Sequence, residues 1–126
     1  MNILLDTHVL LWWLADDPAL PAAARGTIAD GANRVVVSAA TAWEISIKQA
    51  LGKLDVPSEL EEALDAGGIA ALPITVAHAL AAGSLPRHHD DPFDRMLIAQ
   101  AGLEGLTLLT FDENFTPYGV PVLPRA

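Results

Sequence analysis

The sequence predicts an α/β fold in which a parallel sheet of about five strands is covered by helices on both faces. Two observations lead to this prediction. Segments of strand character alternate with helical segments along the chain, and the strands are continuous apolar runs rather than alternating polar and apolar residues. The length of 126 residues and the apolar content of 52% suit a single domain, spanning 1–126, with a full hydrophobic core.

Turn and capping residues divide the first half of the chain into strands and helices. Asp16-Asp17-Pro18 interrupts the first helical pattern, Pro21 suits the first turn of the second helix, and Gly31 follows its end. Ser58 and Glu61 have the spacing of a capping box. The predicted elements are a strand at 2–5, helices at 7–15 and 21–29, a strand at 34–37, a helix from Ser38 or Thr41 to about Gly52, and a helix after Pro57-Ser58.

The second half of the chain continues this alternation. Asp91-Pro92 is a typical helix start and Gly105 a typical helix end. The predicted elements are a strand at 69–74, a helix at 75–83, a helix from Asp91-Pro92 to about Gly105, a strand at 106–111, a short helix, and a last strand at 120–123.

Composition excludes several classes of function. With 16 acidic against 7 basic residues and a formal net charge of −9, the chain lacks the basic surface typical of nucleic-acid-binding proteins. It can still meet a polyanion if its carboxylates gather around bound cations, since the ion then dominates the local charge. The absence of cysteine excludes disulfides, thiolate zinc sites, iron–sulfur clusters and cysteine nucleophiles.

No segment predicts a membrane span or a targeting signal. The apolar run from Ile3 to Ala15 is interrupted by Asp6, Thr7 and His8 and has no basic region before it. It is also shorter than the roughly 20 residues that a span needs. We therefore expect a cytoplasmic protein with no membrane partner.

Four acidic residues lie where parallel sheets bind ligands, which is beyond the carboxyl ends of the strands. Asp6 ends the first strand, and Glu44 lies in the first turns after the second. Asp94 is in the first turn of a later helix, and Asp112 ends the fourth predicted strand. Because all four positions point toward one edge of the sheet, we expect the four carboxylates to share a pocket.

Such a pocket favours a divalent metal ion, because carboxylates gathered in a low dielectric repel one another. Oxygen ligands suit Mg²⁺ or Mn²⁺, and Mg²⁺ keeps coordination positions for water and substrate phosphate. The chemistry that this favours is phosphodiester hydrolysis, in which the ion polarises a phosphoryl oxygen and activates a bound water. Two such ions would add four positive charges to the net charge of −9 and so lessen the repulsion of an anionic substrate.

The four acids stand in four longer segments, namely 2–12 (NILLDTHVLLW), 37–45 (VSAATAWEI), 91–101 (DPFDRMLIAQA) and 108–112 (LLTFD). In this order and over essentially the whole chain, the segments resemble PIN-domain proteins, and more closely the VapC toxins of bacterial toxin–antitoxin pairs. In the fourth segment the family often has Thr-Arg-Asp, and here Phe111 stands in the place of the arginine.

The resemblance implies a PIN-like three-layer fold and a Mg²⁺- or Mn²⁺-dependent ribonuclease that a cognate VapB-like antitoxin holds inactive. It also implies a homodimer. Carried over by position, Asp6 and Asp94 would be direct metal ligands. Glu44 would complete the metal shell or orient water, and Asp112 would help to hold the same ion or a second one. Asp91 and Asp94 are both candidates for the acid of the third segment. Aligning residues 105–108 with the family and counting back without a gap favours Asp94.

Neighbouring polar residues are candidates for supporting the site or contacting RNA. Through the resemblance, Thr7 and Thr110 would be hydrogen-bonding partners of the metal ligands. The candidate substrate-binding residues are Thr7, Lys48, Arg87, Arg95 and Thr110.

Each acid also has a purely structural interpretation. Asp6 would cap the 7–15 helix, and Asp91 would cap the helix that begins at Pro92. Glu44 would form a capping box with Thr41 and pair with Lys48. Asp94 would respond to the helix dipole, Asp112 would cap the turn before Phe115, and Arg95 would pair with Glu44 or Asp91 on the surface.

Histidine and tryptophan give weaker signals. His88 and His89 are adjacent rather than at the i,i+4 spacing that shares a helix face, so they predict no zinc site. Their loop either contacts RNA phosphate or is solvated. Tryptophans 12, 13 and 43 are more typical of a core or an interface than of base stacking. Because residues 12 and 13 are adjacent, they cannot both face one core, and one would line a groove for a partner's helix.

Other functions remain open on the sequence. The main alternative is a catalytically weak PIN-like module kept for protein interaction, although all four acids are present. A phosphoryl-accepting receiver also has an aspartate after its first strand, but it needs a lysine that 106–112 lacks. A haloacid-dehalogenase-type phosphatase needs a second aspartate where this chain has His8.

Overall fold

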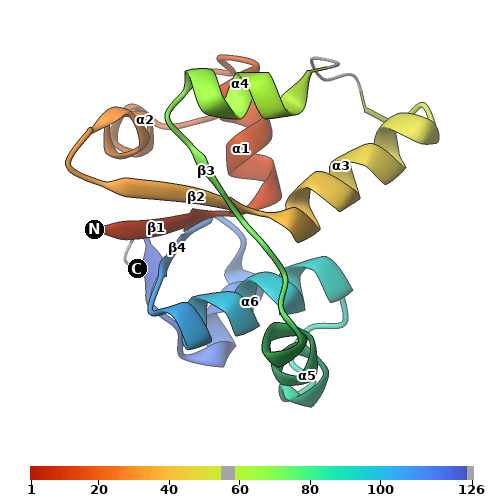
Figure 1. The fold of residues 1–126 in the computed structure, drawn as a ribbon. Coiled ribbons are helices and arrows are strands. Elements are labelled where there is room, and N and C mark those ends of the chain that lie inside the picture. The colour runs from red at the N-terminus through yellow and green to blue at the C-terminus, as the bar shows by residue number, and fades with distance from the viewer. Residues whose placement is uncertain (55–58, 125–126) are drawn as a thin grey trace.

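A computed structural model of the chain describes residues 1–54 and 59–124, and it has the α/β architecture that the sequence predicts. One sheet lies between two layers of helices (Figure 1). The predicted capping box of Ser58 and Glu61 falls partly outside the described residues.

The sheet contains five strands, all parallel, in the order β3-β2-β1-β4-β5. The strands are β1 (Asn2–Leu5), β2 (Arg34–Ser38), β3 (Ala70–Leu72), β4 (Thr107–Leu109) and β5 (Val122–Leu123). The chain builds outward from β1 to β3 on one side and then returns to β4 on the other. The strand order therefore reverses beside β1, and ligand sites of parallel sheets form at such a point.

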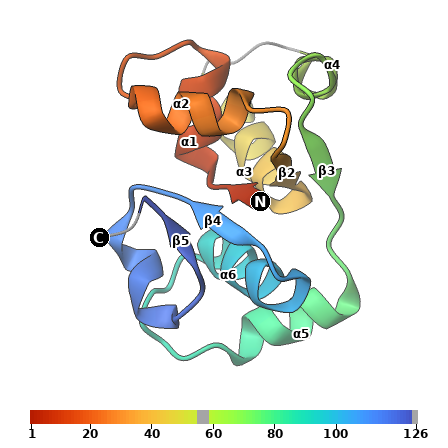
Figure 2. The same cartoon turned by 90° about the vertical axis from the view of Figure 1, so that its left-hand side faces the viewer.

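Helices cover both faces of this sheet. They are α1 (Thr7–Leu14), α2 (Ala22–Ala29), α3 (Ala39–Ala50), α4 (Leu60–Ala66), α5 (Val76–Ser84), α6 (Pro92–Glu104) and the 3₁₀ helix η1 (Glu113–Tyr118). Figure 2 shows α1 and α2 on one face and α5 and α6 on the other. No helix within the described residues is long and apolar enough to cross a membrane.

The hydrophobic core has two parts because successive side chains of a strand point to opposite faces. On β1, Ile3 and Leu5 pack into the cluster beneath α1 and α2, whereas Leu4 packs into the cluster beneath α6. All three are fully buried. Burying each such side chain contributes roughly 1.5–3 kcal/mol, so the central strand anchors both layers.

Three predicted strands are longer than the observed ones. The strand predicted at 69–74 stops at Leu72, before Pro73, which has no amide hydrogen to donate. The strand predicted at 106–111 covers Thr107–Leu109, and just beyond it the Thr110 amide still donates to the Leu123 carbonyl of β5. The last strand likewise begins only after Pro121.

The tryptophans differ from the sequence prediction. Trp12 and Trp13 are both partly buried against the same core cluster, so the prediction that only one of them faces that core is wrong. A large indole ring reaches the core from the flank of α1 as well as from its inner face. Trp43 is 62% exposed and packs edge-to-face on Phe93, with 5.4 Å between ring centroids.

Candidate metal centre

Asp6 lies at the carboxyl end of the central strand and also starts the next helix. It is the N-cap of α1, and its Oδ1 accepts a hydrogen bond of 2.8 Å from the Val9 amide. The Thr110 hydroxyl donates to Oδ2. Only 4% of Asp6 is exposed. The predicted capping role is confirmed, and the same buried carboxylate stands at the point where the strand order reverses.

Glu44 reaches this edge of the sheet from the second turn of α3. Its Oε1 accepts a hydrogen bond of 2.8 Å from Thr7 Oγ1, which lies 3.2 Å from Thr41 Oγ1, and its Oε2 lies 2.9 Å from Lys48 Nζ. Glu44 is 7% exposed. The predicted pair with Lys48 is confirmed. The predicted capping box with Thr41 is wrong, because Ser38 caps α3 and Glu44 bonds Thr7.

The two aspartates at the start of α6 have different partners. Asp91 is the N-cap, and its Oδ1 accepts hydrogen bonds from the amides of Phe93 and Asp94 at 2.9 and 3.1 Å. Asp94 Oδ2 lies 2.8 Å from His89 Nε2. Capping by Asp91 is thus confirmed, and Asp94 is the acid of this helix that lies near the other site residues.

Asp112 follows β4 and begins the 3₁₀ helix. Its Oδ1 accepts a hydrogen bond of 2.9 Å from the Asn114 amide, which confirms the predicted turn cap. Its own amide donates to Thr110 Oγ1 at 3.1 Å, and that hydroxyl in turn donates to Asp6. Thr110 therefore ties the end of β4 to the end of β1.

These side chains converge on one edge of the sheet. Ligand atoms of Asp94, Asp112 and His89 all lie within 4.8 Å of one another, a spacing that could hold a metal ion. The charge of Asp112 acts on Asp6, and the charge of Glu44 acts on Asp94. Of the four acids that the sequence selects, Asp94 and Asp112 belong to this cluster. Asp6 lines a hollow with Asp112, and the charge of Glu44 reaches Asp94. Oxygen ligands gathered at one edge of the sheet in this way suit a hard divalent cation.

Burial changes the proton affinity of two of these acids. Desolvation raises the pKa of Asp6 above its ordinary value, although the hydrogen bond from Thr110 opposes the rise. Desolvation also raises the pKa of Asp94 to about 6; the hydrogen bond with His89 opposes this rise, and the charges of Asp91 and, less strongly, Glu44 add to it. A bound dication would favour the ionised form of both carboxyls, so the donor set fits Mg²⁺ or Mn²⁺.

The three basic candidates lie in different settings. Lys48 pairs with Glu44, as described above. Arg87 has an 88% exposed side chain in the α5–α6 loop and lies 3.9 Å from Asp90. The predicted surface pair of Arg95 with Glu44 or Asp91 is wrong, because its guanidinium binds backbone oxygens instead. They are the carbonyls of Ala82, Leu85, Pro86 and His89, at 3.0–3.3 Å.

His89 is the neighbour of the site that the sequence did not reveal. Its loop was predicted to contact RNA or to be solvated, but the imidazole is only 21% exposed and lies against Asp94. The i,i+4 spacing rule for histidine ligands applies to residues on one helix. It says nothing about a loop such as this one, which folds back over the start of α6. The available signal was a histidine five residues before a candidate ligand.

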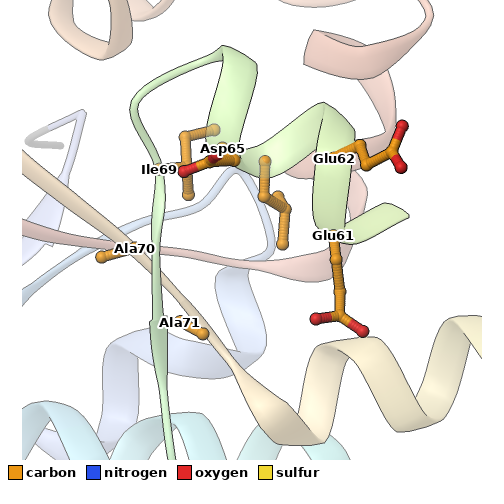
Figure 3. Close-up of a pocket in the computed structure, with 7 residues that line it drawn as sticks. Glu61, Glu62, Asp65, Ile69, Ala70 and Ala71 are labelled. Carbon is orange, nitrogen blue, oxygen red and sulfur yellow. The ribbon is translucent and has the colours of Figure 1, made fainter. Parts of the chain in front are cut away.

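A second acidic region lies elsewhere, over α4 and the edge strand β3. Glu61, Glu62 and Asp65 line a surface hollow of about 410 Å³ together with Ile69 and Ala71. Figure 3 shows that the three carboxylates point in different directions. All three are exposed. This region has the acid content of a metal site without the convergence of one.

The parallel sheet and the acidic centre around Asp6 and Asp94 together define a class of protein. In this class, carboxylates gather where the strand order of the sheet reverses. The PIN domain family model matches residues 3–120, and the chain belongs to this family. No curated protein matches the chain.

Two examples show the solved structures that share the fold. VapBC2 from Rickettsia felis, bound to a DNA fragment from its promoter, has a TM-score of 0.71 and 15% identity over 97% of this chain and 96% of that one. FitAcB from Neisseria gonorrhoeae has a TM-score of 0.61 and 22% identity over 95% of each chain. At these identities the likeness concerns the fold alone.

Proposed function

We propose that this protein is a metal-dependent endoribonuclease and the toxin of a VapBC-type toxin–antitoxin pair. The observation that carries the proposal is the acidic centre at the carboxyl edge of the sheet, where Asp94 and Asp112 share a cluster of ligand atoms and Asp6 lines a hollow with Asp112. Membership of the PIN domain family supports a nuclease. The motif resemblance and the likeness to VapBC2 support the toxin class.

In this proposal Asp6 and Asp94 hold Mg²⁺ or Mn²⁺, and Asp112 holds the same ion or a second one. A bound ion supplies a polarised phosphoryl oxygen, an acidified water and stabilisation of the leaving oxygen. In the hydrolysis the water would lose a proton as its oxygen bonds to phosphorus, the bond from phosphorus to the leaving ribose oxygen would break, and that oxygen would take up a proton. The chain's part is to hold these groups in place before substrate arrives.

The hydrogen bonds of the site suit this work. The Thr110 hydroxyl and a backbone amide fix both oxygens of Asp6, so its carboxylate cannot rotate freely. Thr7 and Lys48 fix Glu44, the acid proposed to complete the metal shell or to orient water. Groups whose positions are set by such bonds lose little entropy when they bind an ion or substrate.

Partner binding belongs to the same proposal. A VapB-like antitoxin would cover the site, and a second copy of the chain would complete a homodimer. Trp43 and Ile47 of α3 and its C-cap Leu51 are spaced four residues apart and are 62%, 36% and 63% exposed. An apolar hollow of about 490 Å³, lined by α2 residues, Leu109 and Phe111, opens beside the acidic centre. Exposed apolar surface of this extent supports a protein partner.

The direct test is cleavage of a fluorescently labelled single-stranded RNA by the purified chain, freed of any partner. We expect cleavage with Mg²⁺ or Mn²⁺, none with EDTA, and none with Asp6→Asn. Asparagine caps helices as well as aspartate does, so circular dichroism should show that the variant keeps the fold. Cleavage that persists in EDTA or in Asp6→Asn would refute the metal-ligand assignment.

The second candidate function is a catalytically weak interaction module, which the exposed apolar residues of α3 favour. Expression in the native host separates the two. The nuclease predicts growth arrest by the chain alone, abolished by Asp94→Asn and relieved by the neighbouring small open reading frame. An absence of any growth effect would favour the interaction module.

A further inference from the structure

We propose that His89 is a nitrogen ligand of the bound ion, so that the centre is a mixed histidine–carboxylate site that prefers Mn²⁺ to Mg²⁺. The inference rests on the proposed metal-dependent function and adds to it a residue and a metal preference. An all-carboxylate centre suits Mg²⁺ as well as Mn²⁺. An imidazole ligand shifts the preference toward first-row transition ions, because Mg²⁺ strongly favours oxygen.

The position of the imidazole carries the inference. His89 Nε2 lies 2.8 Å from Asp94 Oδ2, and ligand atoms of His89, Asp94 and Asp112 lie within 4.8 Å of one another. Two neighbouring ligands of an octahedral ion are roughly 3 Å apart when each metal–ligand bond is about 2.1 Å. The observed separation of Nε2 and Oδ2 is close to that value. Both atoms can therefore reach one ion with only a small movement.

The backbone holds His89 in this place. Its carbonyl oxygen accepts hydrogen bonds from Tyr118 Oη at 3.2 Å and from Arg95 Nη1 at 3.3 Å. Arg95 also binds carbonyls at the end of α5 and in the following loop. The loop is thus fastened at the residue that presents the imidazole.

The rival interpretation is that His89 only hydrogen-bonds Asp94 and orients it. The two interpretations differ in what the metal touches. A ligand places nitrogen in the first coordination sphere, whereas an orienting residue leaves that sphere entirely oxygen. Removal of a ligand weakens Mn²⁺ more than Mg²⁺, whereas removal of an orienting residue weakens both ions alike.

The test is Mn²⁺ binding to the full chain at pH 7.5, followed by electron paramagnetic resonance. Electron spin-echo modulation detects a ¹⁴N nucleus bonded to Mn²⁺, and labelling with ¹⁵N-histidine identifies its source. We expect nitrogen coupling in the unaltered chain and in the matched control His88→Ala, the exposed neighbour of the same type. In His89→Ala we expect no coupling and roughly tenfold or greater loss of Mn²⁺ affinity, with a smaller loss for Mg²⁺.

Every other result of this experiment refutes a specific part of the proposal. Mn²⁺ bound to the unaltered chain without nitrogen coupling refutes His89 as a ligand and leaves the proposed nuclease intact. Coupling that survives His89→Ala but disappears in His8→Ala, beside Asp6, assigns the nitrogen to another histidine. No Mn²⁺ binding at all would refute the proposed metal centre itself. The spectrum of the unaltered chain decides the main point even if a variant fails to fold.

Discussion

The molecule carries two acid-rich regions that behave in opposite ways. At the carboxyl edge of the sheet, Asp6 and Glu44 are 4% and 7% exposed, and each oxygen has a defined partner. Over α4 and β3, Glu61, Glu62 and Asp65 are exposed and point apart (Figure 3). Both regions contribute to the net charge of −9, yet only the first resembles a metal centre.

The difference shows that convergence and burial, rather than the number of acids, create a cation site. Carboxylates in water lose little free energy to their mutual repulsion, because solvent and salt screen it. Burial weakens this screening and also desolvates the ionised carboxylate, and desolvation is the main cause that raises the pKa of Asp94 to about 6. A bound dication offsets this unfavourable free energy by its attraction to the ionised carboxylates. Changes made separately in the two regions should therefore have unequal effects.

The largest expected effect is on catalysis. Asp94→Asn should lower the rate of RNA cleavage by on the order of 10³-fold or more, since metal-supplied stabilisation is worth several kcal/mol. The matched control Glu62→Gln removes the same charge from the exposed region and should leave the rate within about twofold, since solvent and salt screen an exposed charge. Single-turnover kinetics measure both. Equal losses would mean that net charge, and not the site, controls activity.

A smaller effect concerns stability and pH in the absence of metal. A carboxyl whose pKa is raised in the folded state binds more protons there than in the unfolded chain, so stability falls as pH rises from about 4 through about 6. Asp94→Asn should remove much of this fall, at most about 3 kcal/mol from the shift of its pKa.

Urea unfolding at pH 4.5 and pH 7.5 with EDTA measures the pH effect. The variant should be more stable than the unaltered chain at the higher pH, while Glu62→Gln should not differ from it. A variant that is less stable at pH 7.5 would contradict the idea that the ionised Asp94 is destabilising.

The smallest effect concerns the exposed side of the site. Lys48 is 40% exposed and pairs with Glu44 at i,i+4, so Lys48→Met should lower the free energy of unfolding by only about 0.3–0.5 kcal/mol. Thermal melts at low and high salt measure it, with Lys53→Met as a control at a second exposed lysine. A loss above roughly 2 kcal/mol would show that Lys48 does more than form a screened surface pair.

Much of the fold and of the acidic centre could be predicted because both follow from short-range patterns. The apolar run before Asp6 and the helix start at Asp91-Pro92 are local signals, and the parallel sheet then brings the strand ends together. The position of His89 depends instead on Arg95 closing a loop against four carbonyls. No spacing rule encodes such a contact. The error over Thr41 has the same origin, since Thr7 lies 37 residues before Glu44.

Asp6 both begins α1 and lies in the acidic centre, which bears on how an inert form of the protein is prepared. Alanine there would remove a charge and a helix cap at once, and the cap alone is worth about 1 kcal/mol. Asparagine keeps the cap, so Asp6→Asn is the better bait for capturing the RNA or partner that the proposed function calls for.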